Sequence, residues 1–251
     1  MSGHSKWSKI KRKKGANDAK RSKIFARVLK EITVAVREGG SGDPSFNPRL
    51  RLSIANAKGV NLPKDNVERA IKKALDSKDE ALYQPTFEGY GQGGVAIFIE
   101  TTTNNNQRTI SNVRAIFNKR NGSMATSGSV SFMFDRKGIF YFDVMDWDIE
   151  ELELELIDGG AETFEIDSET NEAEVTVDFT NYGDMQKKLE ELKIEVKQAN
   201  LERIPTTTTE VSLDDAKNVL HLIEALEEDD DVNVVFHNLE ITEEIENLMN
   251  E

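Results

Sequence analysis

Residues 137–160, KGIFYFDVMDWDIEELELELIDGG, place a strand directly before a helix. KGIFYFDV is rich in aromatic and β-branched residues, as strands are. DIEELELELIDGG ends in two glycines, which favour the end of a helix. The stretch therefore predicts one strand and one helix in succession, and the segments around it decide to which fold the pair belongs.

The segments after residue 160 extend this pair into a larger unit. ETFEID and AEVTVDFT favour two strands, YGDMQKKLEELK favours a helix, and IEVKQANLERI favours a last strand. Residues 136–204 thus follow the order β-α-β-β-α-β, which is typical of the ferredoxin-like fold.

The segments on either side of residues 136–204 each supply half of the same order. Residues 87–134 contain the strand GGVAIFIETT, a helix that ends at Gly122 and the strand SVSFMF. Residues 205–245 contain the strand TTTTEVS, a helix and the strand VNVVFHNL. Joined across the gap, the halves give a second ferredoxin-like unit, so we predict one α+β domain inserted into another.

The segment before these domains favours helices. The first helix begins near Asn17 or Asp18, the second has Pro48 at its first position, and the third begins near Pro63. The first helix ends at the glycine pair 39–40 and carries one apolar stripe, which predicts a buried face. The members of this stripe are Ile24, Phe25, Val28, Leu29, Ile32, Ala35 and Val36.

The predicted fold class is therefore α+β, with an N-terminal three-helix domain followed by two ferredoxin-like domains. The expected boundaries are residues 1–80 for the basic arm and helical domain, residues 81–135 with 205–251 for the discontinuous domain, and residues 136–204 for the inserted domain.

Charge is divided unevenly along this chain, whose formal net charge is -14. Residues 1–78 contain 20 Lys and Arg and 7 Asp and Glu, whereas residues 79–251 contain 12 and 39. Such asymmetry favours a polyanionic partner for the basic part, because Lys and Arg neutralise phosphates and release counterions. The alternative is that the basic part docks on the acidic part of its own chain.

The candidate nucleic-acid-binding residues belong to the arm and to the first helix. Trp7 in the arm has two interpretations: it stacks on a splayed base, or it anchors the arm on the helical domain. The second and third helices, joined at 59–62, also permit a distant variant of a helix-turn-helix. The candidate residues are Lys6, Trp7, Lys9, Lys11, Arg12, Lys13, Lys14, Lys20, Arg21, Lys23, Arg27, Lys30 and Arg37.

Other chemistry finds little support in the sequence. There is no Cys, and the histidines lack metal-ligand spacing, so we predict neither a metal nor a cofactor. The glycine-rich segment 88–94 precedes a strand, whereas a phosphate loop precedes a helix, so it is interpreted as a flexible entry into the sheet. The acidic run 227–231 is interpreted as a solvated face. We expect no enzymatic activity, no small-molecule substrate and no membrane span.

Several motifs together give a resemblance. GHSKW (3–7), NDAKR (17–21), KIF (23–25), NPRLR (47–51) and EGYG (88–91), with GDP at 42–44, are similar to the YebC/PmpR family. The resemblance covers the whole chain; the family pattern has Pro after EGYG, where this chain has Gln92. It implies a helical domain with two α+β domains, nucleic-acid binding, a cytoplasmic setting and no catalysis.

Two functions follow from the resemblance and the charge together. The first is a DNA-binding transcriptional regulator, which is the label that the family carries. The second is a translation factor that binds ribosomal RNA or the ribosome, as the family's mitochondrial translational activators imply. A lysine-rich arm suits recognition of structured RNA, which is met mainly through its shape and phosphates.

Overall fold

The computed structural model describes residues 18–76, 81–144, 147–168 and 170–250. It divides into two compact units. Of the described residues, the first unit comprises 18–23, 81–135 and 204–250, and the second comprises those within 24–76 and 136–203. Each unit is described by itself below.

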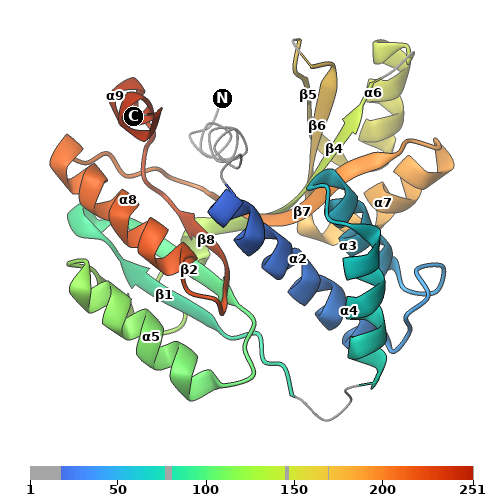
Figure 1. The fold of residues 1–251 in the computed structure, drawn as a ribbon. Helices are drawn as coiled ribbons and strands as arrows, with labels where there is room; N and C mark the ends of the chain where they lie inside the picture. Colours follow the sequence, from blue (N-terminus) through green and yellow to red (C-terminus); the bar gives the residue numbers. More distant parts are fainter. Residues whose placement is uncertain (1–17, 77–80, 145–146, 169, 251) are drawn as a thin grey trace. The chain divides into compact units, whose positions relative to one another are not determined.

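The first unit is built on one antiparallel sheet. Helices α5 (Asn106–Lys119) and α8 (Leu213–Glu227) lie side by side on one face of this sheet (Figure 1), and α9 (Glu243–Asn250) packs against α8. The strands in their order across the sheet are β3 (Ser123–Ala125), β1 (Thr86–Tyr90), β2 (Ala96–Thr101) and β8 (Val232–His237).

A continuous apolar core lies between this sheet and its helices. Ile97 and Ile99 of β2 point into it, together with Phe117 of α5 and Leu222 of α8, and all four are fully buried. The opposite face of the sheet carries a smaller cluster around Phe98, whose ring lies 6.3 Å from that of Phe134. Burial on both faces explains why β2 is almost continuously apolar.

The order of strands in the first unit differs from the prediction. The position next to β2 belongs to β1, which is joined to it by a tight hairpin in which the Gly91 N–H donates to the Val95 carbonyl at 2.8 Å. Gly93 in this hairpin has φ of 67°, a conformation that favours glycine. Segment 88–94 is therefore the end of a strand and its turn, and the predicted strand TTTTEVS contributes only an isolated bridge at Thr209.

The segment SVSFMF does not form the strand that the sequence predicts. The buried carboxylate of Glu88 accepts hydrogen bonds from the backbone N–H groups of Gly128, Val130 and Ser131, at 2.7, 2.6 and 3.1 Å. These backbone N–H groups therefore donate to a side chain and are not available for the hydrogen bonds of a β-sheet. The chain forms a loop and a short 3-10 turn before β4 begins at Phe134.

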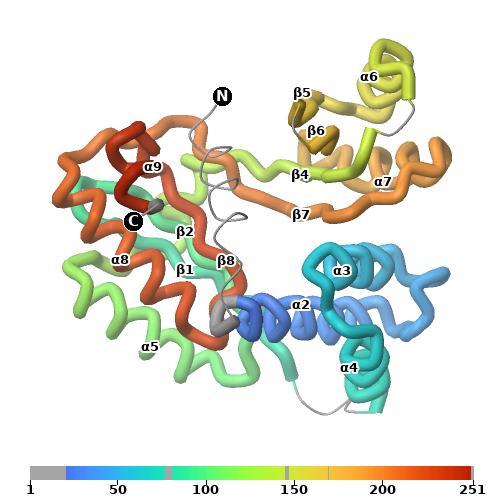
Figure 2. The backbone as a smooth tube through the Cα atoms, turned by 45° about the horizontal axis from the view of Figure 1, so that its top comes forward, coloured from blue at the N-terminus to red at the C-terminus, as the bar shows by residue number. Residues whose placement is uncertain are grey.

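The second unit contains the other four-stranded antiparallel sheet. Helices α6 (Ile149–Asp158) and α7 (Tyr182–Glu191) cover one face of it (Figure 2). The strands in order are β5 (Ala161–Ile166), β6 (Glu172–Asp178), β4 (Phe134–Asp143) and β7 (Val196–Pro205). This order is the one that a β-α-β-β-α-β chain adopts in the ferredoxin-like fold, and it confirms the α+β fold class.

Three helices at the start of the second unit form their own core. They are α2 (Asp18–Gly39), α3 (Pro48–Gly59) and α4 (Lys64–Asp76). Ile32 and Leu50 are completely buried between them. Asn47 caps α3 by accepting from the Leu50 N–H at 3.0 Å, and its amide donates to the Ala35 carbonyl of α2 at 2.8 Å. One side chain therefore both starts α3 and ties it to α2.

Helix α3 also docks on the edge strand β7. The side-chain amide of Asn56 donates to the Ala199 carbonyl and accepts from the Ala199 N–H, both at 2.9 Å, as a neighbouring strand would. Leu52 packs against the core of the inserted sheet, and Arg51 pairs with Glu190 at 2.7 Å. A Cβ at Gly59 would meet the Lys197 carbonyl oxygen at 2.6 Å, so glycine permits this close approach.

We predict that Gly59→Ala lowers the free energy of unfolding by about 1–3 kcal/mol, because a methyl group forces α3 away from β7. Urea denaturation checks this. Gly183→Ala is the matched control, since a Cβ there meets nothing within 4 Å, and it should be neutral or stabilise by up to about 1 kcal/mol. Equal effects of the two substitutions would contradict the docking argument.

Candidate nucleic-acid interface

Helix α2 carries the described part of the predicted basic site. Its apolar stripe is buried as expected, with Val28, Ile32 and Val36 inside the helical core. Ile24, Phe25 and Leu29 are partly buried against the same core. Val34, on the other side of the helix from Ile32, is also buried, so α2 is packed on more than one face.

The basic residues of α2 are less exposed than a free ridge would be. Arg21 is exposed, whereas Lys23, Arg27, Lys30 and Arg37 are half-buried. Lys23 donates to the Glu228 carbonyl at 3.0 Å, and both residues belong to the first unit. Arg21, Arg27, Lys30 and Arg37 each have an interaction partner in the structure.

The predicted arm residues lie outside the described residues. They are Lys6, Trp7, Lys9, Lys11, Arg12, Lys13 and Lys14, and for Lys20 only the helical backbone is described. The structure thus brings together only the basic residues of α2.

Helices α3 and α4 meet across a short turn, as a helix-turn-helix would require. In such a motif, the N-terminal residues of the second helix contact base edges in the major groove. The first turn of α4 instead exposes the carboxylate of Asp65. The neighbouring Lys64 forms an ion pair with Glu68 one turn later. A carboxylate there repels phosphates, so α4 lacks the surface of a recognition helix.

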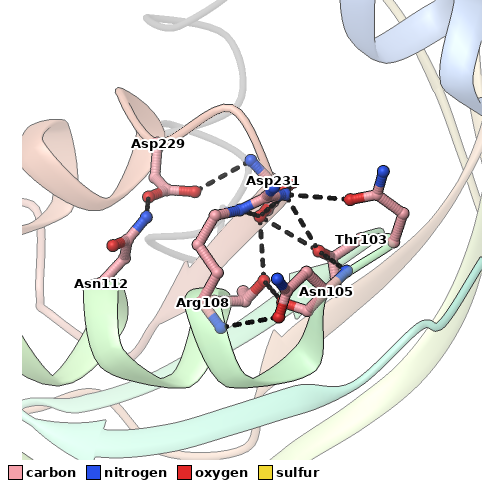
Figure 3. A network of polar contacts seen from close by, with 8 residues as sticks. Thr103, Asn105, Arg108, Asn112, Asp229 and Asp231 are labelled. Carbon is pink, nitrogen blue, oxygen red and sulfur yellow. Dashed lines mark hydrogen bonds and ion pairs between the residues drawn. The ribbon is translucent and has the colours of Figure 1, made fainter.

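An ion pair between Arg108 and the buried carboxylate of Asp231 anchors α5 in the first unit. Arg108 donates to Asp231 through Nε and Nη2, with a shortest distance of 2.7 Å. The Asp231 side chain also accepts from the hydroxyls of Thr103, at 3.1 Å, and Thr109, at 2.9 Å. Figure 3 shows Arg108 and Thr103 directed at Asp231, with Asn112 directed at Asp229 beside it.

This network corrects the interpretation of the acidic run 227–231 as a solvated face. Asp231 is only 6% exposed, and Asp229 accepts from the Asn112 amide at 2.9 Å. The sequence signal was the polar segment TTTNNNQRT (101–109), which runs into the first turn of α5 and in which Asn105 caps the helix by accepting from the Arg108 N–H. The network ties the start of α5 to the turn between α8 and β8.

The network shifts the pKa values of both members of the ion pair. Burial by itself would raise the pKa of Asp231, but the hydrogen bonds from Arg108, Thr109 and Thr103 outweigh it and lower that pKa below its ordinary value. The hydrogen bond to Asp231 raises the pKa of Arg108. The pair is therefore charged at neutral pH.

Within the described ranges, no group of three His, Asp or Glu side chains is placed to hold a metal. A shallow open depression lies on α4 between Asp65, Glu68, Arg69 and Lys72. Among the helices of the described segments, none is long and apolar enough to cross a bilayer.

The helical domain and the two four-stranded antiparallel sheets, each covered by helices, define a class of multidomain α+β proteins. Residues 5–77 match the family description TACO1/YebC protein N-terminal domain, and residues 82–239 match TACO1/YebC second and third domain. The chain belongs to the TACO1/YebC family, which confirms the resemblance found in its motifs.

Its relatives are similar over nearly their whole length. A probable transcriptional regulatory protein of Geotalea uraniireducens is 47% identical over 245 residues, 97% of this chain and 98% of the relative. A probable transcriptional regulatory protein of Amoebophilus asiaticus is 46% identical over 240 residues, which are 95% of this chain and 98% of the relative. The crystal structure of a conserved hypothetical protein from Aquifex aeolicus is 38% identical with a TM-score of 0.76, covering 91% of this chain and 93% of that one.

We predict that Asp231→Asn lowers the free energy of unfolding by about 1–3 kcal/mol at neutral pH, because Arg108 loses its charged partner. The pKa of Asp231 is lowered in the folded state, so its contribution is present above the unfolded value of about 3.9 and is lost as pH falls through the folded pKa. Urea denaturation at neutral and acidic pH measures both effects.

The control for this prediction is Asp135→Asn, which changes an exposed carboxylate of the same unit. It should alter stability by less than about 0.5 kcal/mol. A difference between wild type and Asp231→Asn that stays constant below pH 4 would contradict the proposed role of the ionised carboxylate.

Proposed function

We propose that this protein is a DNA-binding regulator of gene expression whose basic N-terminal segment contacts the phosphates of the duplex. The observation that carries the proposal is the division of charge: 20 Lys and Arg against 7 acids in residues 1–78, but 12 against 39 in residues 79–251. The relatives described as probable transcriptional regulatory proteins support the same conclusion.

The proposed mechanism is electrostatic. Each Lys or Arg that neutralises a phosphate releases condensed counterions, which supplies affinity without reading sequence. The acidic residues of the remaining chain repel the same polyanion, so it approaches from the basic side. The arm residues carry most of this contact, because the described basic residues of α2 already have partners within the protein.

Backbone contact is favoured over reading of base edges. A recognition helix presents donors and acceptors to the major groove, whereas α4 presents a mixture of Asp65, Glu68, Arg69 and Lys72. Contacts to phosphates position a protein on a duplex but carry no sequence information. Sequence preference, where it exists, then comes from the shape of the DNA.

The same observation favours a second candidate, a translation factor that binds ribosomal RNA. Structured RNA is recognised mainly through shape, phosphates and 2′-hydroxyls, so a basic surface without a recognition helix suits it. Both candidates place the protein in the cytoplasm, without a small-molecule substrate or a catalytic step. They differ in the nucleic acid that the arm prefers.

A competition titration between duplex DNA and purified ribosomes, near physiological salt, tests both candidates. The variant Lys11→Gln/Lys13→Gln/Lys14→Gln removes three arm charges. We expect it to weaken binding and to lower the dependence of log K on log salt by up to about 2.7, since each phosphate contact contributes about 0.9. Lys187→Gln/Lys193→Gln/Lys217→Gln removes as many charges from the acidic body and should change little.

Each outcome decides between the candidates. Preference for the duplex, lost in the arm variant but kept in the body variant, supports the transcriptional function. Preference for ribosomes, lost in the same way, supports the translational one. If arm and body variants bind equally well to both partners, the basic segment is not the contact and the proposal is wrong.

A further inference from the structure

Helix α5 lies in a segment without acidic residues, within the otherwise acidic part of the chain. Residues 79–251 contain 39 Asp and Glu, yet residues 101–134 contain none. The same segment holds Arg108, Arg114, Lys119 and Arg120. The acidic part of the chain therefore includes one helix that carries only positive charge.

The exposed face of α5 is polar and basic apart from Ala115. Its inward face is closed by Val113 and Phe117, which are fully buried in the core of the first unit. At 3.6 residues per turn the exposed residues fall on one continuous side of the helix, opposite these two. They are Gln107, Arg108, Ser111, Asn112, Arg114, Ala115, Asn118 and Lys119, with Arg120 at the C-cap.

Three cations on this face are not used within the protein. Among the described residues, Arg114, Lys119 and Arg120 form no ion pair. Two lysines of the second unit are neutralised by contrast: Lys188 pairs with Glu155 at 2.7 Å, and Lys197 pairs with Asp143 at 2.5 Å. The cations of α5 therefore remain available to a partner outside the chain.

We propose that the exposed face of α5 is a second contact surface for the phosphodiester backbone of a nucleic acid. The argument is charge complementarity: Arg and Lys neutralise phosphates, and Ser, Asn and Gln donate hydrogen bonds to phosphate and sugar oxygens. No carboxylate belongs to this face. It also lacks the large apolar side chains that a protein partner would bury. The inference rests on the proposed nucleic-acid binding and adds a second point of attachment in the body.

The two edges of this face differ. Along one edge, Arg108 is occupied by Asp231 and Asn112 by Asp229, and these acids repel phosphates. Arg114 lies on the other side of the helix face, about 120° around the axis from Arg108, as the spacing of six residues requires. The nucleic acid therefore contacts Arg114 and the C-terminal end of α5, where Lys119 lies two turns beyond Asn112 and Arg120 follows at the C-cap.

A purely structural role accounts for part of the same pattern. Cations in the last turn of a helix stabilise its dipole, which applies to Lys119 and Arg120. It does not apply to Arg114, which lies in the middle of α5, nor does it explain the lack of acids over the whole segment 101–134. A structural role would change stability without changing the affinity for nucleic acid.

The test compares three full-length variants that each lose three positive charges. They are Arg114→Gln/Lys119→Gln/Arg120→Gln on α5, Lys11→Gln/Lys13→Gln/Lys14→Gln on the arm, and Lys187→Gln/Lys193→Gln/Lys217→Gln on the body. Fluorescence anisotropy with a short duplex DNA, and with an RNA duplex of the same sequence, gives affinities over a series of salt concentrations. Thermal unfolding of each variant gives its stability.

We expect the α5 variant to bind at least about tenfold more weakly than the body variant, with a salt dependence smaller by about 2. The nucleic acid that shows the larger loss is the one that this face contacts. Gln keeps a high helix propensity, so α5 itself should persist.

Failure of the inference is distinguishable from failure of the proposed function. If wild type binds and only the arm variant loses affinity, the α5 surface is overturned and the proposed function stands. If wild type binds neither duplex nor ribosomes, both are overturned. A loss of stability in the α5 variant, with affinity equal to that of the body variant, assigns α5 a structural role and overturns the inference.

Discussion

The two-sided hydrogen bonding of Asn56 to the edge strand β7 is the interaction on which the second unit depends. Residues 24–78 and 136–203 are separated in the chain, so only non-covalent contacts hold the helical domain against the inserted sheet. An amide that both donates to and accepts from Ala199 fixes the position of α3 along β7, and Gly59 allows the close approach. It also occupies backbone groups of an edge strand that would otherwise attract another strand.

Segregation of charge is the second constraint, and it connects the fold with the proposed function. Residues 138–186 contain no Lys or Arg, so the sheet of the second unit relies on a few lysines elsewhere, such as Lys137 and Lys197, for its ion pairs. Like charges destabilise a compact state by repulsion. The proposed contact of α5 with a nucleic acid rests on this contrast between an acidic chain and one helix free of acids.

Much of the fold followed from the sequence where local pattern and tertiary structure agree. Residues 136–204 form the strands and helices that their local patterns predict. The four strands also take the order expected for the ferredoxin-like fold. The discontinuous domain was predicted less well, because Glu88 takes the backbone donors of residues 128–131 and β1 pairs with β2 through a local hairpin. The basic arm and the lack of acids in residues 101–134 are evident from composition. The burial of Asp231 is not, because the contacts that bury it come from segments far apart in the sequence.

The position of β8 at the end of the chain has a consequence for how the protein is made. β2 pairs with β1 on one side and with β8 on the other, and β8 begins only at Val232. During synthesis from the N-terminus, one edge of the apolar strand β2 (AIFIET) therefore lacks its partner β8 until more than a hundred further residues have been added. The acidic residues of the intervening chain oppose pairing of this open edge with other copies of the chain, because like charges repel.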